Sequence, residues 1–201
     1  MNAVTADPAP FPAAALTVLD VIRARRTVDI GLLRPDAVPR EVVGAILEAG
    51  IWAPNHGRTE PWRFTVFTGE GRARLADVFA QAYAAGAAPD REDGAALEAQ
   101  RARAWRAPLW ISLELHMPEK PKMPEWEEQA ALACAAQNMW LAATAFGLVG
   151  KWVSGPVMVS PVAAQALGAP KLLGLLVLGY PAAELPTATR APLADKVTWV
   201  E

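Results

Sequence analysis

The stretch WEEQAALACAAQNMWLAATAF, residues 126–146, decides how the chain is organised. It is rich in alanine and carries no charge after Glu128, so it predicts one long helix that is buried on most of its circumference. Cys134 lies in the middle of this helix, where we expect it to act as a buried small apolar residue. A helix of this kind belongs at the centre of a fold, with other elements packed around it.

The segments on either side of this helix alternate between strand and helix patterns. Apolar, β-branched and aromatic runs predict strands over residues 62–68, 109–115, 149–153 and 172–180. The last of these, LLGLLVLGY, is continuously apolar, which is typical of a strand covered on both faces. Helical spacing of apolar residues predicts helices over 16–25, 39–53, 70–84, 94–106 and 160–167.

The order of these segments indicates the α+β class, with a central mixed sheet flanked by helices. We find no internal repeat and no linker that would divide the chain, and 201 residues suit one domain with a sizeable core. We expect a flexible N-terminal arm over residues 1–14 and a single domain over 15–201. The segment that ends in KVTWVE is too short to pack alone, and we expect it to reach a partner subunit.

Composition and charge argue against several classes of protein. The formal net charge is −2, so no basic field is present to recruit nucleic acid. The apolar runs are too short to span a bilayer, and no basic segment followed by an apolar one marks a secretory signal. A single cysteine rules out an internal disulfide framework. We therefore expect a cytoplasmic protein that binds neither nucleic acid nor membrane.

The sequence also lacks the motifs of several common enzymes. No G-x-G-x-x-G opens a helix, and no G-x-S-x-G marks a serine nucleophile. The two histidines, His56 and His116, have no partners at the spacing of a zinc site, and we expect no metal. Glu114 and His116 lie two residues apart on a predicted strand and point the same way, which suits a strand-end pair better than a ligand pair.

Three separated segments carry groups that suit an anion or a flat ring. Arg25-Arg26-Thr27 offers two guanidiniums and a hydroxyl, which together suit a phosphate. The alternative is that these arginines cap the last carbonyls of the preceding helix. The segments APNHGRTEPWRF, residues 53–64, and GKWVSGP, residues 150–156, are dense in donors and in Gly and Pro, and each taken alone is compatible with an ordinary turn.

The order and spacing of these segments resemble the FMN-dependent nitroreductase family, in its small single-domain bacterial branch. The shared features are the RR[ST] triplet, the A-P-x(6)-P-W-x-F loop after the next helix, the long alanine-rich helix and the G-x-W-x-S-G loop. The resemblance covers roughly residues 16–200. It implies a three-layer sandwich and an intertwined homodimer with FMN held between the subunits.

The resemblance also implies roles for particular residues. Those that match cofactor-binding positions are Arg25, Arg26 and Thr27 at the phosphate and ribityl chain, Arg190 as a second charge on the phosphate, Trp152, Val153 and Ser154 along the isoalloxazine edge, and Trp52 and His56 from the second subunit. FMN has a dianionic phosphate and no adenylate, so a local basic cluster suits it better than a dinucleotide fold. No side chain is assigned a catalytic role, because the flavin carries the chemistry.

Three positions depart from the pattern of many relatives. Arg58 and Glu60 stand where Asn and Gln are common, and Asp29 stands where a basic residue often follows the RR[ST] triplet. That basic residue helps to hold negative charge on the reduced ring. Arg58 or Lys151 is a candidate to replace it.

The function implied by the resemblance is that of an FMN-dependent NAD(P)H oxidoreductase. It would transfer hydride through flavin N5 in a ping-pong cycle to an electron-poor small molecule, such as a nitroaromatic or a quinone. Two alternatives stay open. One is a flavin-binding module that stores reduced FMN or senses redox state with little turnover. The other is a cofactor-free α+β protein whose tryptophans and long helix serve only dimer packing.

Overall fold

A five-stranded antiparallel sheet forms the middle of the molecule. In the computed structural model, which describes residues 11–86, 94–185 and 187–201, the strand order is β1-β3-β5-β4, and β2 also pairs with β3. All strand pairs are antiparallel. The strands are β1 (Trp62–Arg63), β2 (Val66–Thr68), β3 (Leu109–Leu115), β4 (Val149–Val153) and β5 (Lys171–Gly179).

The two central strands are the most apolar ones. Every residue of β3 is buried, and so are seven of the nine residues of β5. Such strands stay in the middle of a sheet because both of their faces are covered, as the continuous apolar run of β5 predicts. The parallel component expected of a mixed sheet is limited to one isolated bridge between Thr27 and Gly150.

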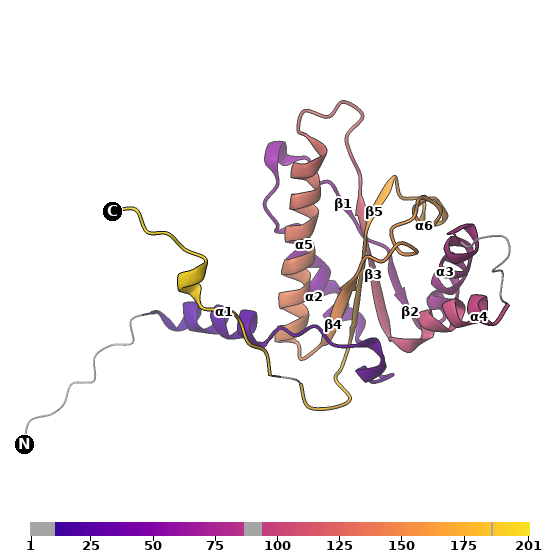
Figure 1. The fold of residues 1–201 in the computed structure, drawn as a ribbon, viewed down its shortest axis with the longest axis horizontal. Coiled ribbons are helices and arrows are strands. Elements are labelled where there is room, and N and C mark those ends of the chain that lie inside the picture. Colours follow the sequence, from indigo (N-terminus) through magenta and orange to yellow (C-terminus); the bar gives the residue numbers. More distant parts are fainter. Residues whose placement is uncertain (1–10, 87–93, 186) are drawn as a thin grey trace, which may run out of the picture.

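Helices cover both faces of the sheet and make the predicted three layers (Figure 1). On one face lie α2 (Arg40–Ile51) and α5 (Glu125–Ala145), and on the other lie α3 (Arg72–Gly86), α4 (Gly94–Arg103) and α6 (Pro161–Leu167). Each face has its own apolar core. Ile46 and Met139 belong to the core under α2 and α5, whereas Phe79 and Trp110 belong to the core under α3 and α6.

Within one subunit the long helix α5 is buried on one face only, so the predicted burial over most of its circumference is met there only in part. Its buried residues recur every three or four positions, and Gly50 of α2 lies so close that an added Cβ would be 2.7 Å from Met139 Cγ. The opposite face is open, and Cys134 is exposed rather than buried. Alanine is small and apolar, so its abundance did not distinguish a covered face from an open one.

The predicted strand over residues 62–68 is split in two. Between β1 and β2 the N–H of Thr65 donates to the side-chain hydroxyl of Ser112, at 2.8 Å, instead of to a backbone carbonyl. The register of β3 against β5 also shifts, between Leu113 and Glu114. A hydroxyl that replaces a ladder partner has no signature in an alternating pattern, so the interruption could not be predicted.

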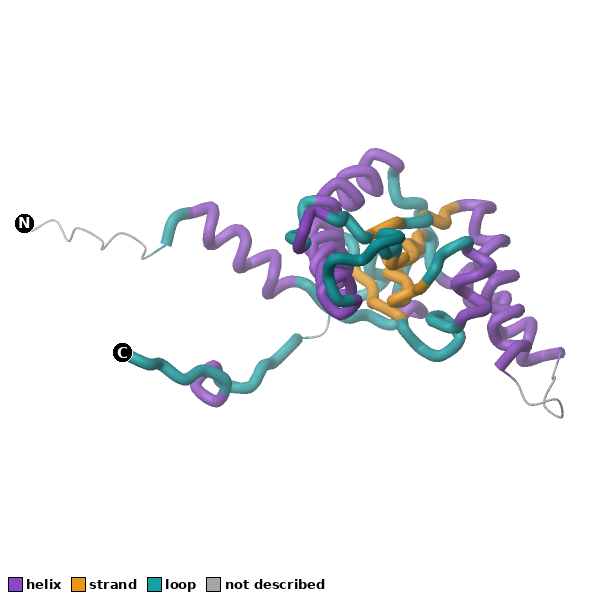
Figure 2. Tube along the Cα trace, turned by 90° about the horizontal axis from the view of Figure 1, so that it is seen from above, coloured by secondary structure: helices purple, strands orange, loops and turns teal. Residues whose placement is uncertain are grey.

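Two segments project from the body on the same side. Helix α1 (Ala13–Ala24) has no buried residue, and the tail beyond β5 runs out beside it (Figures 1 and 2). Of the predicted N-terminal arm, residues 1–10 lie outside the described residues, and Ala13 and Ala14 already belong to α1.

Candidate functional site

Two of the three sequence-predicted segments meet at the start of β4. The N–H of Val28 donates to the carbonyl of Gly150, at 2.9 Å, and Thr27 forms the parallel bridge with the same residue. The Arg-Arg-Thr segment therefore lies directly beside the first residue of the Gly-Lys-Trp segment, although more than 120 residues separate them in the chain. The sequence predicted both segments but not their pairing.

Arg25 has an unusual environment for a cation. Its guanidinium lies 4.5 Å from the ring centroid of Trp140 on α5, a cation–π contact. Its Nη1 is buried and has no hydrogen-bond partner. Burial first, and then the charges of Arg190 and Arg26, hold the pKa of Arg25 below its ordinary value. An arginine stays protonated in proteins, so the site retains a positive charge that lacks a compensating anion.

A small pocket gathers three arginines from both ends of the chain. Its volume is about 240 Å³, and its lining residues are Arg25, Arg26, Thr27, Thr187, Ala188 and Arg190. None of the described residues that line it carries a carboxylate. Arg26 also donates to the carbonyls of Arg23 and Arg25, so the helix-capping interpretation holds for this residue. Arg190 donates to the carbonyl of Thr189, at 2.8 Å.

This donor set fits a phosphate group. Guanidiniums are the side chains best suited to bind phosphate in a forked geometry, and a buried donor without a partner costs free energy until it is paired. A dianion at this pocket would relieve both the repulsion among the arginines and the unpaired Nη1 of Arg25. The phosphate of FMN, as implied by the resemblance, therefore agrees with the residues present.

Lys151, one of the two candidates to replace the missing basic residue, is paired. Its Nζ lies 3.1 Å from Oδ2 of Asp29, and the other oxygen of Asp29 accepts from the N–H of Gly31, at 2.9 Å. The Gly31 N–H and Lys151 together lower the pKa of Asp29. The acidic residue that departs from the family pattern is thus a partner of the nearest lysine.

The loop that follows Lys151 presents few free groups. The indole N–H of Trp152 donates to the carbonyl of Leu173, at 2.9 Å, and its ring lies against Gly174, where a Cβ would be 2.6 Å from Nε1. The side chain of Val153 is buried in the core, so only its backbone is available to a ligand. Ser154 is exposed.

His56 lies far from the arginines within one chain. The side chain of His56 contacts Glu127, with Nδ1 and Oε2 2.6 Å apart, and Trp52 is 78% exposed. Glu127 and Trp140 are thirteen residues apart on α5, a separation of about 20 Å along a helix. Within one subunit, His56 and Arg25 therefore lie near opposite ends of α5.

Two contacts of this region had no signal in the sequence. Trp140 is an aromatic residue on a helix that we predicted as buried, and nothing marked it as the neighbour of Arg25. Glu128 is buried and accepts from the hydroxyl of Thr59, at 2.6 Å, which holds the loop after α2. In that loop Arg58 and Glu60 have positive φ, at 54° and 46°, a conformation that costs about 1 kcal/mol or more for residues other than glycine.

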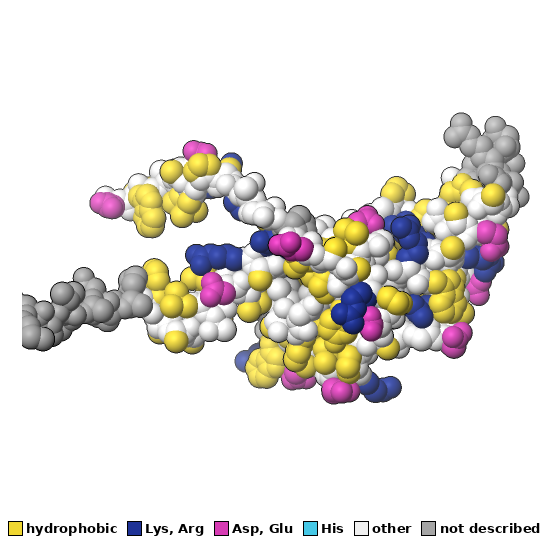
Figure 3. Space-filling view, turned by 90° about the horizontal axis from the view of Figure 1, so that it is seen from below, with side chains coloured by type: hydrophobic (Ala, Val, Ile, Leu, Met, Phe, Trp, Pro, Cys, Tyr) yellow, Lys and Arg dark blue, Asp and Glu magenta, His cyan; other side chains and the backbone are white. Residues whose placement is uncertain are grey.

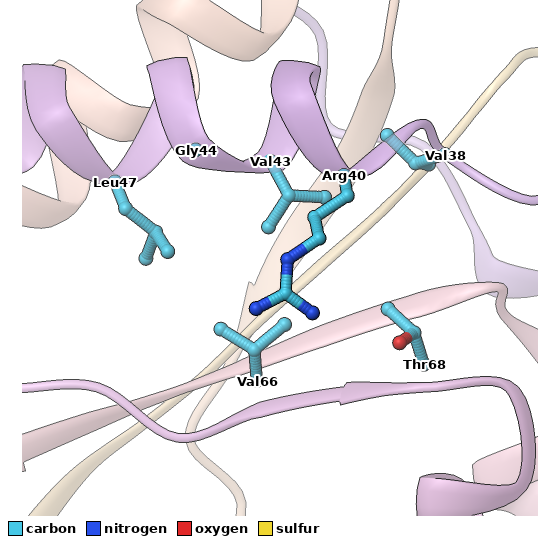
Figure 4. Close-up of a pocket in the computed structure, with 7 residues that line it drawn as sticks. All are labelled: Val38, Arg40, Val43, Gly44, Leu47, Val66 and Thr68. Atoms are coloured by element: carbon cyan, nitrogen blue, oxygen red, sulfur yellow. The ribbon is translucent and has the colours of Figure 1, made fainter.

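A larger pocket, of about 430 Å³, lies between α2 and β2 (Figure 4). The Arg40 side chain reaches from the start of α2 toward Val66, between apolar walls. None of the sequence-predicted site residues lines it. Within the described parts of the chain, no three His, Cys, Asp or Glu side chains are placed to hold a metal ion. Among the same residues, every helix is too short or too polar to cross a bilayer.

Comparison with known proteins identifies the family. The sequence profile of the nitroreductase family matches residues 22–180, and the chain belongs to this family. Over 180 residues it is 35% identical to YdjA of Escherichia coli (strain K12), whose name assigns it provisionally as an NAD(P)H nitroreductase. That match covers 88% of this chain and 95% of YdjA.

Solved structures agree with this assignment. A nitroreductase-like family protein from Bacillus cereus has a TM-score of 0.77 and 25% identity, and the match covers 99% of this chain and 100% of that one. A nitroreductase with bound FMN from Bacteroides fragilis NCTC 9343 has a TM-score of 0.65 and 28% identity, covering 92% and 98%. The predicted family and the predicted fold class are thereby confirmed.

Proposed function

We propose that the protein is an FMN-dependent NAD(P)H oxidoreductase that reduces an electron-poor small molecule such as a nitroaromatic or a quinone. The observation that carries the proposal is the pocket of three arginines, in which a buried Arg25 nitrogen lacks a partner. FMN bound to the Bacteroides fragilis relative and the NAD(P)H in the name of YdjA support the choice of cofactor and donor.

The residues of the chain bind and orient the cofactor in this proposal. Arg25, Arg26 and Arg190 hold the phosphate, with the Thr27 hydroxyl beside them. Ser154 and the backbone of Val153 border the ring, and Trp152 fixes this loop through its bond to Leu173. FMN supplies the hydride transfer between donor and acceptor when it is bound. No side chain of the protein has to act as a nucleophile.

A homodimer completes the site in this proposal. His56 contacts Glu127, about 20 Å along α5 from the Trp140 that holds Arg25, and we assign both His56 and Trp52 to the flavin of the second subunit, as the resemblance implies. The exposed apolar side chains of α1 and of the tail support an intertwined arrangement in which the tail packs on the partner. We place the enzyme in the cytoplasm, where NAD(P)H is supplied.

The direct test is a visible absorption spectrum of the purified protein, repeated without oxygen after addition of NADH or NADPH. We expect flavin absorption bands at about 370 and 450 nm, and we expect these bands to bleach after one of the two donors is added. Bands that persist with both donors would favour a flavin-binding storage or sensing module. No bands, even after incubation with FMN, would contradict the assignment of Arg25, Arg26 and Thr27.

A further inference from the structure

The two projecting segments leave the body of the subunit at the same place. We call α1 and the tail over residues 187–201 the two arms. The chain that leaves α1 runs beside the chain that leaves β5: the N–H of Arg34 donates to the carbonyl of Tyr180, at 2.8 Å, and the N–H of Ala182 donates to the carbonyl of Leu32, at 2.9 Å. Both arms then extend away from the body on the same side (Figures 1 and 2).

Both arms carry apolar side chains that are exposed among the described residues of the subunit. The exposed ones are Leu16, Val18 and Ile22 on α1, and Leu193, Val197, Trp199 and Val200 on the tail. Figure 3 shows hydrophobic side chains along each arm. Exposed apolar surface of this extent marks an interface. The arms leave the body beside α5, whose open face carries Cys134 and other small uncharged residues, so a second copy of the chain is the partner that this surface fits.

The arginine pocket lies between the bases of the arms. One wall comes from Arg25, Arg26 and Thr27, directly after α1, and the other comes from Thr187, Ala188 and Arg190 on the tail. Both walls are positively charged, so without an anion they repel each other. Arg190 is one of the charges that lower the pKa of Arg25, which is the expected effect of that repulsion.

We propose that a phosphate anion in this pocket joins the bases of the two arms, so that phosphate binding and association with a second copy of the chain strengthen each other. The inference rests on the proposed function only for the natural source of the phosphate, which is FMN. An anion between the walls turns repulsion into attraction and fixes the direction of both apolar arms. Less conformational freedom is then lost when the second copy binds.

Coupling of this kind is reciprocal. If phosphate strengthens dimerisation by some factor, dimerisation strengthens phosphate binding by the same factor. Typical coupling between two sites changes affinity by about 5-fold to 150-fold, and we expect about tenfold here, because the charged groups are partly exposed. We expect FMN to strengthen dimerisation. We expect no strengthening by riboflavin, because it lacks the phosphate.

The test measures how fast subunits exchange between two dimer populations that carry different fluorescent labels. Exchange is followed in inorganic phosphate, in chloride at the same ionic strength, and with FMN or riboflavin. We expect phosphate and FMN to slow exchange about tenfold relative to chloride and riboflavin. Sedimentation under the same conditions gives the monomer–dimer distribution.

Two variants separate the pocket from general charge effects. Arg190→Gln removes one wall charge from an exposed position, so folding is not at risk, and it is expected to abolish the response to phosphate and FMN. Arg23→Gln is the matched control, since Arg23 is an exposed α1 residue paired with Asp20, and it does not line the pocket. It is expected to respond as the parent protein does.

The inference and the proposed function fail in different ways. Exchange slowed by inorganic phosphate in a protein that never binds or reduces flavin would support the inference and contradict the function. A flavin protein that is reduced by NAD(P)H, but whose exchange is equally fast with FMN and with riboflavin, would overturn the inference alone. A chain that stays monomeric under every condition would also overturn it.

Discussion

Arg25 shows how one residue can depend on both ends of the chain. Its charge is held against the ring of Trp140, 115 positions later, and is repelled by Arg190 in the tail. The triplet that contains it was recognisable in the sequence, because two adjacent arginines and a hydroxyl form a compact motif. Its aromatic neighbour was not, because a contact across the fold leaves no trace in local spacing.

Arg26 shows why the triplet was ambiguous. Both interpretations of a terminal arginine are present in the structure, since Arg26 lines the pocket and also donates to the last carbonyls of α1. Local sequence carries the same information for both roles. Only the arrival of Arg190 from the tail distinguishes an anion pocket from a helix cap.

The pair between Asp29 and Lys151 predicts a small, pH-dependent contribution to stability. The folded-state pKa of Asp29 lies below the unfolded-state value, so the pair stabilises the fold at neutral pH, and this is lost as pH falls through the folded-state pKa. The side chain of Asp29 is 63% exposed, so solvent screens the pair. Asp29→Asn should lower the free energy of unfolding at neutral pH by less than about 1 kcal/mol.

Urea unfolding of the parent and of Asp29→Asn across a pH series measures this contribution. Asn keeps an oxygen that can accept from the Gly31 N–H, so the substitution isolates the charge. The difference between the two proteins should shrink as pH falls through the folded-state pKa of Asp29 and vanish at a pH well below it, where the carboxyl is protonated. A difference that stays constant down to that pH would show that the charge of Asp29 has no part in it.

Among the elements, β4 is the one that joins the site to the core. Gly150 accepts from Val28 on the site side, and its own Cα packs against β5, where an added Cβ would lie 1.7 Å from the carbonyl oxygen of Val177. Gly150→Ala therefore has to separate β4 from β5. We expect a loss of about 3 kcal/mol in the free energy of unfolding, measured by urea titration.

Gly44 in α2 provides the matched control. A Cβ added at Gly44 meets nothing within 4 Å, and alanine is the better helix former. Gly44→Ala should raise the free energy of unfolding by about 0.5 to 1 kcal/mol. If Gly150→Ala unfolded at the same urea concentration as the parent protein, the close approach of β4 to β5 would be contradicted.

At the scale of elements, the strand and helix patterns predicted most of the fold. The strands over 109–115 and 149–153 have the predicted bounds, because apolar runs flanked by Pro or Gly define both of their ends. The prediction of one continuous strand over 62–68 was wrong, because the Ser112 hydroxyl interrupts the hydrogen-bond ladder there. Within one subunit α5 is covered on fewer sides than predicted, because alanine suits a covered face and an open one equally.

At the scale of the whole molecule, the single subunit leaves its function incomplete. The arginines lie at one end of α5 and His56 lies near the other, and both arms extend away from the body. The sequence predicted a partner through its resemblance to the family and through a tail that is too short to pack alone. The structure adds a physical reason for one: the apolar arms are exposed, and His56 lies about 20 Å along α5 from the arginines.

The central claim, that the arginine pocket binds the phosphate of FMN, is tested most directly by comparing the affinities of FMN and riboflavin for the flavin-free protein by fluorescence titration. Charge-assisted hydrogen bonds are worth about 1.5 to 3 kcal/mol each, so FMN should bind at least about a hundredfold more tightly than riboflavin. Arg25→Gln and Arg190→Gln should each weaken FMN binding at least about tenfold and leave riboflavin unchanged. Equal affinities for the two ligands, or variants that weaken both alike, would contradict the account.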